Sequence, residues 1–443
     1  MAESLPVAML AQLEALGTAL LTVAKEHRDA PLATLERGVL EAVQSFLPRL
    51  LEEVLKCSTS DLQPVSAHWQ QPCPNCGQRT EAQSWRQRTV RTICGTITFE
   101  RPWFVCDHCK HNFSTVDRTL QLEPRGRLSE GLQEWIVGLG ATTSFAEAAY
   151  WLQKMTGLEV SDETIRQHTE CRGQEIEVAQ QRASEQVKKT QEPAGPVDPA
   201  PGTVVIETDA VKVRYVDGWH DVKIGLVAGH QDGEMVAPSY IAARKSAEEF
   251  GPRLLAEAAR RGALEVVAWE GPLTQRGLAV LRQVVVIGDG AVWIWNLAAE
   301  HFGERIEIID YYHASEHIWT VAKALYGEGT PETSTWAGEQ TKALLEKGAD
   351  PVLKALAEAK AQTHEAAEVL RVERGYFRTN ATRMDYPTFR ALGLPIGSGA
   401  VESSAKHLVQ QRMKRPGARW SEPGAQAVLN VRSRLLSGLP LAS

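Results

Sequence analysis

The sequence predicts an α/β protein of several domains, with a mixed sheet in its C-terminal half and mainly helices before it. Three observations lead to this prediction: two cysteine pairs between residues 73 and 109, a proline-rich run at 189–202, and alternating strand and helix patterns after residue 203. The 443 residues exceed one typical domain, so size does not limit the core. Hydrophobic residues make up 43% and charged residues 23% of the chain, as in ordinary soluble proteins.

The sequence carries no evident export or membrane signal. No stretch comes near the roughly 20 continuous apolar residues of a membrane helix, and an acid stands near the N-terminus in place of a basic signal start. Four of the seven cysteines form C-x2-C pairs, a spacing that favours a metal ion over disulfides and indicates a reducing cytosol. We therefore expect a cytoplasmic protein with no membrane partner.

Residues 1–62 predict an N-terminal region of two amphipathic helices. In the second helix, Leu40, Val43, Phe46 and Leu47 recur at helical spacing. Such helices are typical of a packing or self-association module, and their side chains indicate no chemistry.

Residues 66–122 predict a zinc ribbon. The motifs CPNC and CDHC flank a segment that alternates apolar and polar residues around a glycine, as in a β-hairpin. Two such turns can close four thiolates into the tetrahedron that Zn²⁺ prefers. His108 and His111 lie close by, but four cysteines already fill the coordination shell. We therefore expect one structural zinc ion on Cys73, Cys76, Cys106 and Cys109.

Residues 126–188 predict a helical region that contains a helix-turn-helix. One helix ends at Gly157, and the next begins at Ser161, a good N-terminal cap. In DNA-binding proteins the second helix of this pattern enters the major groove, where Arg166 and Gln167 would face the bases. An ordinary helical hairpin has the same pattern, so the residues leave both interpretations open. The proline-rich run 189–202 then predicts a linker.

Residues 203–443 predict one large domain built on a mixed sheet. Three strand patterns precede a helix that begins with a capping box of Ser246 and Glu249, and strands and helices then alternate. This order, β-β-β-α-β-α-β-α, is that of RNase H-like folds. A helical stretch at about 314–390 separates the last strand from the helix that carries Glu402, so we expect an all-helical insertion there.

Several acids are placed where they could meet at one edge of this sheet. Asp289 and Asp310 each end an apolar strand pattern, and the carboxyl ends of parallel strands collect reactive groups. Asp209 would come from the first strand and Glu402 from the last helix. Three such acids can hold two Mg²⁺ ions for phosphodiester cleavage. Spacing alone also fits a plain turn at Asp289 or a helical salt pair between Glu402 and Lys406.

These residues resemble insertion-sequence DDE transposases of the ISKra type in bacteria. The resemblance covers nearly the whole chain and rests on CPNC…CDHC, ETDAVKV, GWHDVKIG, VIGDGAVWIWNLAAEHF…IIDYYHASEHI and, most specifically, GLPIGSGAVESSAKHLVQQRMKRPGARW. It implies that Asp209, Asp289 and Glu402 are a catalytic triad that binds two Mg²⁺ or Mn²⁺ ions. It also implies that Asp310 and His313 are accessory to the site, although Asp310 competes with Asp289 for the role of metal ligand.

The basic residues beyond Glu402 predict contact with DNA. The net charge of −7 argues against a uniformly basic protein, but residues 402–434 hold seven Lys or Arg against two acids. Four of these cations are candidates for phosphate contact, and a solvated helix end is the alternative interpretation. They are Arg412, Lys414, Arg415 and Arg419.

The resemblance implies a DNA transposase that binds the ends of an insertion sequence and catalyses metal-dependent cleavage and strand transfer. Its partners would be double-stranded DNA, as terminal inverted repeats and target, and at least one further copy of the chain on paired ends. It would act at the nucleoid in the bacterial cytoplasm. Two alternatives remain open: a transposase-derived DNA-binding regulator without catalysis, and an RNase H-like nuclease without strand transfer.

Overall fold

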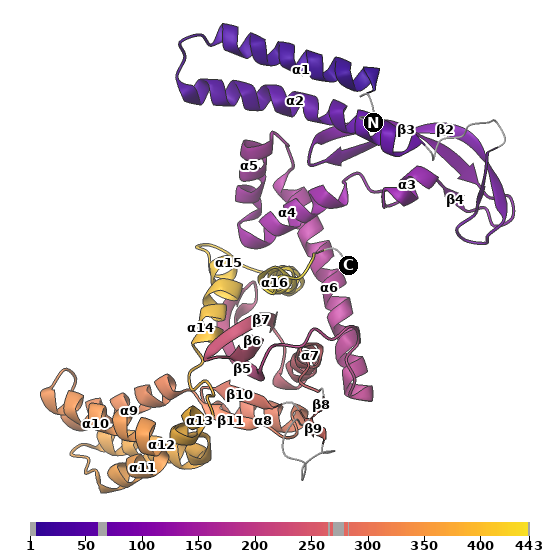
Figure 1. Cartoon of the computed structure of the whole chain (residues 1–443). Coiled ribbons are helices and arrows are strands. Elements are labelled where there is room, and N and C mark those ends of the chain that lie inside the picture. The colour runs from indigo at the N-terminus through magenta and orange to yellow at the C-terminus, as the bar shows by residue number, and fades with distance from the viewer. Residues whose placement is uncertain (1–5, 61–68, 265, 269–278, 282, 442–443) are drawn as a thin grey trace. The chain divides into compact units, whose positions relative to one another are not determined.

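The computed structural model describes residues 6–60, 69–264, 266–268, 279–281 and 283–441. The chain divides into two compact units, Met1–His168 and Thr169–Leu441. Figure 1 shows the elements in order along the chain. The fold is mixed α/β, as predicted, and its two main sheets belong to different units.

The first unit begins with two long helices, α1 (Val7–Glu26) and α2 (Leu32–Ser58), which lie side by side in Figure 1. Neither helix contains a buried residue. Helix α1 is long and apolar enough to cross a membrane by length and composition alone, and the expected lack of a membrane partner stays a prediction. The helix consists mainly of leucine, valine and alanine, and few charged residues interrupt them. One such helix near an N-terminus is weak evidence for a span, because signal sequences and core helices pass the same test.

The small sheet of the first unit is antiparallel, and its strand order follows the chain order. A long hairpin of the second and third strands dominates it, and the aromatic rings of Phe104 and Phe113 stack at 4.8 Å beneath the cysteines. Arg88 in this hairpin donates to Asp117 at 2.7 Å and so ties the following short helix to the sheet. The elements are β1 (Gln70–Pro72), β2 (Arg79–Thr92), β3 (Gly95–Val105), β4 (Asn112–Phe113) and α3 (Thr115–Thr119).

Three helices follow the small sheet: α4 (Glu130–Thr142), α5 (Phe145–Thr156) and α6 (Asp162–Thr190). Helix α5 ends at Gly157, whose φ of 73° is the left-handed conformation that terminates helices at glycine. The hydroxyl of Ser161 accepts the N–H of Thr164 at 3.1 Å, which confirms the predicted cap at the start of α6. Helix α6 has 29 residues and runs as one helix to Thr190, where the helical region predicted to residue 188 gives way to the proline-rich run.

The second unit is built on a five-stranded sheet of order β11-β10-β5-β6-β7. The pairs β10–β11 and β10–β5 are parallel, whereas β5–β6 and β6–β7 are antiparallel. The predicted central strand VVVIG is β10, and all five of its residues are buried. The strands are β5 (Thr203–Tyr215), β6 (Gly218–Gln231), β7 (Glu234–Ala243), β10 (Val284–Gly288) and β11 (Ile306–Ile309); a separate pair is β8 (Val266–Ala268) and β9 (Ala279–Leu281).

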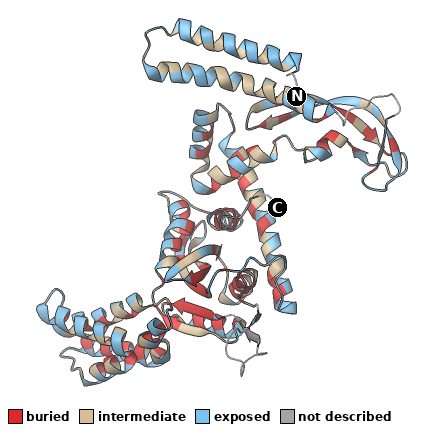
Figure 2. Ribbon diagram, viewed as in Figure 1, coloured by how far each residue is buried: buried red, intermediate tan, exposed pale blue. Residues whose placement is uncertain are grey.

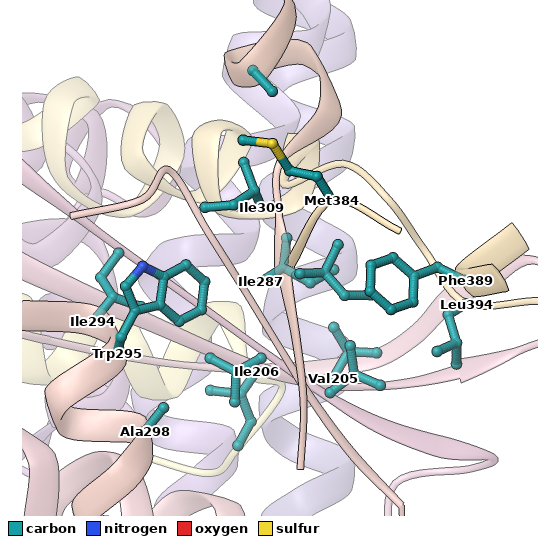
Figure 3. Packing of buried hydrophobic residues seen from close by; sticks show 14 of the residues in the cluster. Val205, Ile206, Ile287, Ile294, Trp295, Ala298, Ile309, Met384, Phe389 and Leu394 are labelled. Carbon is teal, nitrogen blue, oxygen red and sulfur yellow. The ribbon is translucent and has the colours of Figure 1, made fainter. Parts of the chain in front are cut away.

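Helices cover this sheet and complete its core. The predicted capping box of Ser246 and Glu249 is present at the start of α7 (Ala247–Arg260). In Figure 3, Trp295 of α8 (Val292–His301) and Met384 of the helical segment lie around Ile287 of β10, within one buried cluster. The same strands are mostly buried in Figure 2. The core therefore anchors the strands that carry the candidate acids.

The expected helical insertion is a cluster of helices between β11 and the C-terminal segment, grouped together in Figure 1. Its members are α9 (Tyr311–Tyr326), α10 (Pro331–Lys347), α11 (Ala349–Glu358), α12 (His364–Asn380), the 3-10 turn η3 (Ala381–Arg383) and α13 (Tyr386–Ala391). The chain then returns to the sheet in α14 (Gly399–Ser404), the π-helical turn η4 (Ala405–Gln410), α15 (Gln411–Met413) and α16 (Glu422–Leu436).

Candidate metal centre and active site

Four cysteine side chains meet beside the long hairpin. Cys73 and Cys76 lie between β1 and β2, Cys106 and Cys109 lie between β3 and β4, and their four sulfur atoms are all within 4.8 Å of one another. Two of the sulfur pairs are each 3.6 Å apart. A tetrahedral ion with Zn–S bonds of about 2.3 Å would separate its sulfurs by about 3.8 Å. The group can therefore bind a metal ion such as zinc, as the spacing predicted.

The two cysteine turns have the same backbone geometry. Gly77 donates its N–H to the carbonyl of Cys73 and Lys110 donates to that of Cys106, both at 2.8 Å. Both donors have positive φ, 75° for Gly77 and 60° for Lys110. The backbone N–H of Cys109 lowers the pKa of Cys106, whereas burial and hydrogen bonds from the other three cysteines raise that of Cys76, so the four thiols share their protons unequally.

The parallel strands bring three aspartates to one edge of the large sheet. The register of β10 against β5 pairs Ile287 with Glu207, so Asp289 is level with Asp209 two residues further on. Strand β11 runs parallel to β10 and ends immediately before Asp310. All three carboxyl groups therefore lie at the level where β10 and β11 end, as the strand patterns predicted.

Glu402 reaches the same edge from the C-terminal segment. It lies in α14, and the backbone N–H of its neighbour Val401 donates to the Glu207 carboxyl of β5 at 2.7 Å. The charge of Glu402 also affects the pKa of Asp209, which shows that the two carboxyl groups are close to each other. Burial raises the pKa of Asp209, and the negative charges of Asp289 and Glu402 raise it further, against the opposing hydrogen bond from Ala210.

These carboxylates are spread more widely than the cysteines. Across the described ranges, the cysteines form the one group of three or more potential ligands whose donor atoms all lie within 4.8 Å. The triad of Asp209, Asp289 and Glu402 does not meet that criterion. Carboxylates that bind two ions about 4 Å apart surround a larger space than the ligands of one ion, so their oxygens need not all lie so close together.

Glu207 is a residue at this edge that the strand patterns did not single out. Its side chain is fully buried on β5, and burial raises its pKa to about 8, helped by the charges of Asp310 and Glu402. The signal was present in ETD: strand side chains alternate between faces, so Glu207 and Asp209 share one face of a buried central strand.

Asp310 caps the helix that carries His313. Its Oδ1 accepts the backbone N–H of Tyr312 at 2.6 Å and that of His313 at 3.3 Å. Its Oδ2 accepts the N–H of Ser398 at 2.8 Å and also the Ser398 hydroxyl. Asp310 therefore joins the end of β11 to the segment just before α14.

His313 belongs to a chain of side chains that no sequence pattern indicated. Its Nε2 is 3.3 Å from Nε2 of His317, whose Nδ1 is 2.7 Å from a carboxylate oxygen of Glu373 on α12. The ring of Tyr376 stacks on His317 at 3.9 Å, and its hydroxyl donates to the carbonyl of Asp289 at 3.1 Å. The helical segment thus contacts the loop that bears Asp289.

Arg166 and Gln167 lie in the first turns of α6, beyond the turn that follows α5. Glu163 accepts hydrogen bonds from both side chains, at 2.6 Å from Arg166 Nη2 and 2.7 Å from Gln167. Arg166 is half-buried and Gln167 is exposed. Their amide and guanidinium groups are therefore oriented by a neighbour on the same helix.

The four cations beyond Glu402 have different surroundings. Arg412 is only 4% exposed, and its guanidinium lies over the ring of Trp420 at 4.8 Å. Lys414 and Arg419 are exposed, and Arg415 is half-buried. Burial leaves Arg412 little surface for a phosphate, whereas the other three side chains reach solvent.

The model of an uncharacterised protein family, UPF0236, matches residues 35–197. That range includes the cysteine group and the helices α4, α5 and α6. A protein of Streptococcus gallolyticus described as the UPF0236 protein in the vanSb 3′ region is 23% identical over 364 residues. The match covers 80% of this chain and 73% of the relative. Both comparisons therefore show a similarity to UPF0236 proteins, and neither description names an activity.

One solved structure is also similar to part of the chain. It is a chain from the cryo-EM structure of the simian T-cell lymphotropic virus intasome in complex with the PP2A regulatory subunit B56 gamma. The match is 12% identical and covers 41% of this chain and 51% of that chain, about half its length. Its TM-score is 0.15, so it carries no weight for the fold or the function.

Proposed function

We propose that this chain is a DNA transposase that binds the ends of an insertion sequence and catalyses metal-dependent DNA cleavage and strand transfer. The observation that carries the proposal is the meeting of Asp209, Asp289 and Glu402 at one edge of the large sheet, although they come from three elements far apart in the sequence. Carboxylates held close together repel one another, which costs free energy, so packing does not explain why they meet here. A cluster of this kind is typical of a site that binds cations.

The strand order supports an RNase H-like assignment for the second unit. Three parallel strands, β11, β10 and β5, continue into the antiparallel β6 and β7. The helical segment from α9 to α13 enters after β11, and the chain then returns to the same edge in α14. This arrangement agrees with the insertion-sequence transposase resemblance of the sequence.

The donor set at the edge fits hard divalent cations. Carboxylate oxygens are the ligands that Mg²⁺ and Mn²⁺ prefer, and the raised pKa of Asp209 reflects negative charge that a cation would offset. Asp209, Asp289 and Glu402 would hold these ions, and Asp209 is the acid whose pKa both other carboxylates raise. Such ions lower the pKa of an attacking water and neutralise charge on the phosphate.

The residues themselves would align the substrate. Lys414, Arg415 and Arg419 reach solvent beyond the Glu402 helix and would contact the DNA backbone. Arg412 is left out of this set, because it is buried against Trp420. The side chains that hold Glu402 in place would keep its carboxylate oriented while the water or 3′-hydroxyl attacks.

The first unit would bind the element ends. Its cysteine group would hold one structural Zn²⁺ ion, and α6 would present Arg166 and Gln167 to the major groove of DNA. A transposition reaction on two paired ends would require at least a dimer. The protein would then act on DNA in the bacterial cytoplasm.

Cleavage and joining of labelled DNA test the proposal. The substrate is DNA that flanks the gene of this protein, with Mg²⁺ present, and the comparison is wild type with Asp289→Asn and Glu402→Gln. We expect cleaved and joined products from wild type and a loss of about 1,000-fold or more in both variants, with DNA binding retained. Glu358→Gln, which changes an exposed glutamate at the end of α11, is the matched control and should behave like wild type.

The same assay separates the alternatives. Cleavage without joined products would favour a nuclease of the same fold. Binding of the element ends without any cleavage would favour a DNA-binding regulator. Variants as active as wild type would exclude these carboxylates from the chemistry.

A further inference from the structure

Two buried carboxyl groups hold the start of the helix that carries Glu402. Glu207 and Asp310 are 0% and 1% exposed, and they come from β5 and from the end of β11. Both accept hydrogen bonds from the segment between Ser398 and Val401. Neither belongs to the three acids of the proposed triad.

The oxygens of Asp310 are already occupied. Oδ2 accepts two hydrogen bonds from Ser398, and Oδ1 accepts the N–H groups of Tyr312 and His313. A carboxylate offers about four acceptor positions, and these four donors fill them. Asp310 therefore has no lone pair left for a metal ion in this arrangement.

Glu207 makes a single bond, directly beside the catalytic candidate. Its Oε2 accepts the N–H of Val401 at 2.7 Å, and Val401 precedes Glu402 in the chain. Its Oε1 is buried and has no hydrogen-bond partner. The side chain thus acts through one oxygen, at the point where the Glu402 helix meets the strand of Asp209.

The helix needs such partners because its own residues do not cap it. The first N–H groups of a helix lack the usual partners within the helix, and the N–H of Val401 is shared between the Ser398 carbonyl at 3.0 Å and the Glu207 carboxyl at 2.7 Å. Ser398, the N-terminal cap position of α14, accepts no hydrogen bond with its side chain and instead donates its hydroxyl to Asp310. The Glu207 carboxyl therefore takes over part of the capping, and Asp310 ties the cap residue Ser398 to the end of β11.

We propose that Glu207 and Asp310 are positioning residues that set Glu402 against Asp209 and Asp289, and that neither binds the metal ions. The inference rests on the proposed function of the triad, because only then does the position of Glu402 control a reaction. Glu207 would then position Glu402 whereas Asp209, two residues further along the same face of β5, would bind the metal ions.

Two substitutions of Glu207 separate positioning from metal binding. Glutamine keeps an oxygen for the Val401 N–H and places its NH₂ where Oε1 has no partner, whereas leucine fills the space without an acceptor. We expect Glu207→Leu to slow cleavage by about 10- to 100-fold, as for groups that orient metal ligands. Glu207→Gln should stay within about threefold of wild type, because it retains the one bond that the structure contains.

A metal ligand would behave in the opposite way. If Glu207→Gln were as inactive as Glu402→Gln, Glu207 would be a ligand and the inference would be wrong. If Glu207→Leu cleaved like wild type, the bond to Val401 would not control the site. Asp310→Asn should cleave DNA slowly, because the NH₂ of asparagine would face an N–H donor. Its affinity for Mn²⁺ should nevertheless equal that of wild type in a titration in which Asp209→Asn binds weakly.

Hydrogen exchange tests the positioning without any reaction. In the full chain free of DNA, peptides that cover residues 397–404 should exchange faster in Glu207→Leu than in wild type. Glu207→Gln and Glu402→Gln should exchange like wild type. Equal exchange in Glu207→Leu would overturn the inference even if cleavage were affected. Faster exchange in a chain that never cleaves DNA would support the docking while the proposed function failed.

Discussion

Single side chains at the sheet edge differ sharply in their surroundings. Glu207 is fully buried and its pKa of about 8 keeps it mostly protonated at neutral pH, whereas Asp209 is only partly buried beside other carboxylates.

The backbone conformation of Gly290, which follows Asp289, is equally specific, with a φ of 104°. A Cβ atom at this position would lie 2.7 Å from the ring of Tyr376. The loop that bears Asp289 therefore requires glycine next to it.

Gly290→Ala should destabilise the second unit by about 1–3 kcal/mol, because alanine is strained at this φ and collides with Tyr376. Urea unfolding of the full chain, followed by circular dichroism, measures the free energy of unfolding. Gly303→Ala is the matched control: Gly303 has no positive φ, and a Cβ atom placed there would meet no other atom within 4 Å. Equal stability of the two variants would contradict the strain at Gly290.

At the scale of elements, charged and polar side chains tie helices of the second unit together. Glu177 of α6 accepts hydrogen bonds from Arg253 of α7 and Asn430 of α16, each at 2.9 Å. The π-helical turn after α14 is held similarly, because buried Arg432 of α16 donates to the carbonyl of Leu408 at 2.7 Å. Helix α16 thus stabilises both α6 and the segment that follows Glu402.

The bonds to Glu177 predict a pH dependence. Burial raises the pKa of Glu177, but the hydrogen bonds from Arg253 and Asn430 outweigh it, and the pKa is lowered overall. A lowered pKa contributes stability above the ordinary value of 4.5, and this contribution is lost as the pH falls through the folded value. Glu177→Gln should cost about 1–2 kcal/mol at pH 7.

The difference between Glu177→Gln and wild type should shrink when the pH falls well below 4.5. Urea unfolding at pH 7 and at acid pH measures both free energies. Glu346→Gln, an exposed glutamate on α10, is the control and should match wild type at both pH values. A constant difference across pH would exclude a contribution from the ionised Glu177.

Over the whole molecule, the large and the small sheet differ in the size of the apolar cluster beside them. The second unit has a large buried cluster that includes strands β5 and β10. The small sheet of the first unit has a much smaller cluster, formed by Cys73, Cys106 and two phenylalanines. Small apolar cores commonly depend on a metal ion, because they bury too little surface to offset chain entropy.

Metal removal should therefore act on one unit alone. With a chelator, or in Cys106→Ser, we expect zinc to be lost and hydrogen exchange to rise in β2 and β3 while β5 and β10 stay protected. Zinc content by atomic absorption and exchange by mass spectrometry measure both effects. Cys57→Ser, at an exposed cysteine outside the group, should leave both unchanged. A purified chain without bound metal, or equal exchange with and without chelator, would count against a structural zinc ion.

The sequence alone determined the features that depend on near neighbours in the chain. The cysteine turns, the cap at Ser161, the capping box at Ser246 and the buried strand β10 follow from spacing, local hydrogen bonds and continuous hydrophobicity. Strand ends also predicted that Asp289 and Asp310 would lie at one edge, because parallel strands end together. The helical region predicted up to residue 188 agrees with α6, which ends at Thr190.

Only the tertiary structure decided how each side chain at that edge is used. Glu207 bonds to Val401 across 194 residues, and Asp310 bonds to Ser398 across 88 residues. No pattern along the chain contains such pairs, because burial and hydrogen bonding depend on which elements pack together. The same reason explains Arg412, a candidate for DNA contact by its basic sequence context, which the fold buries against Trp420.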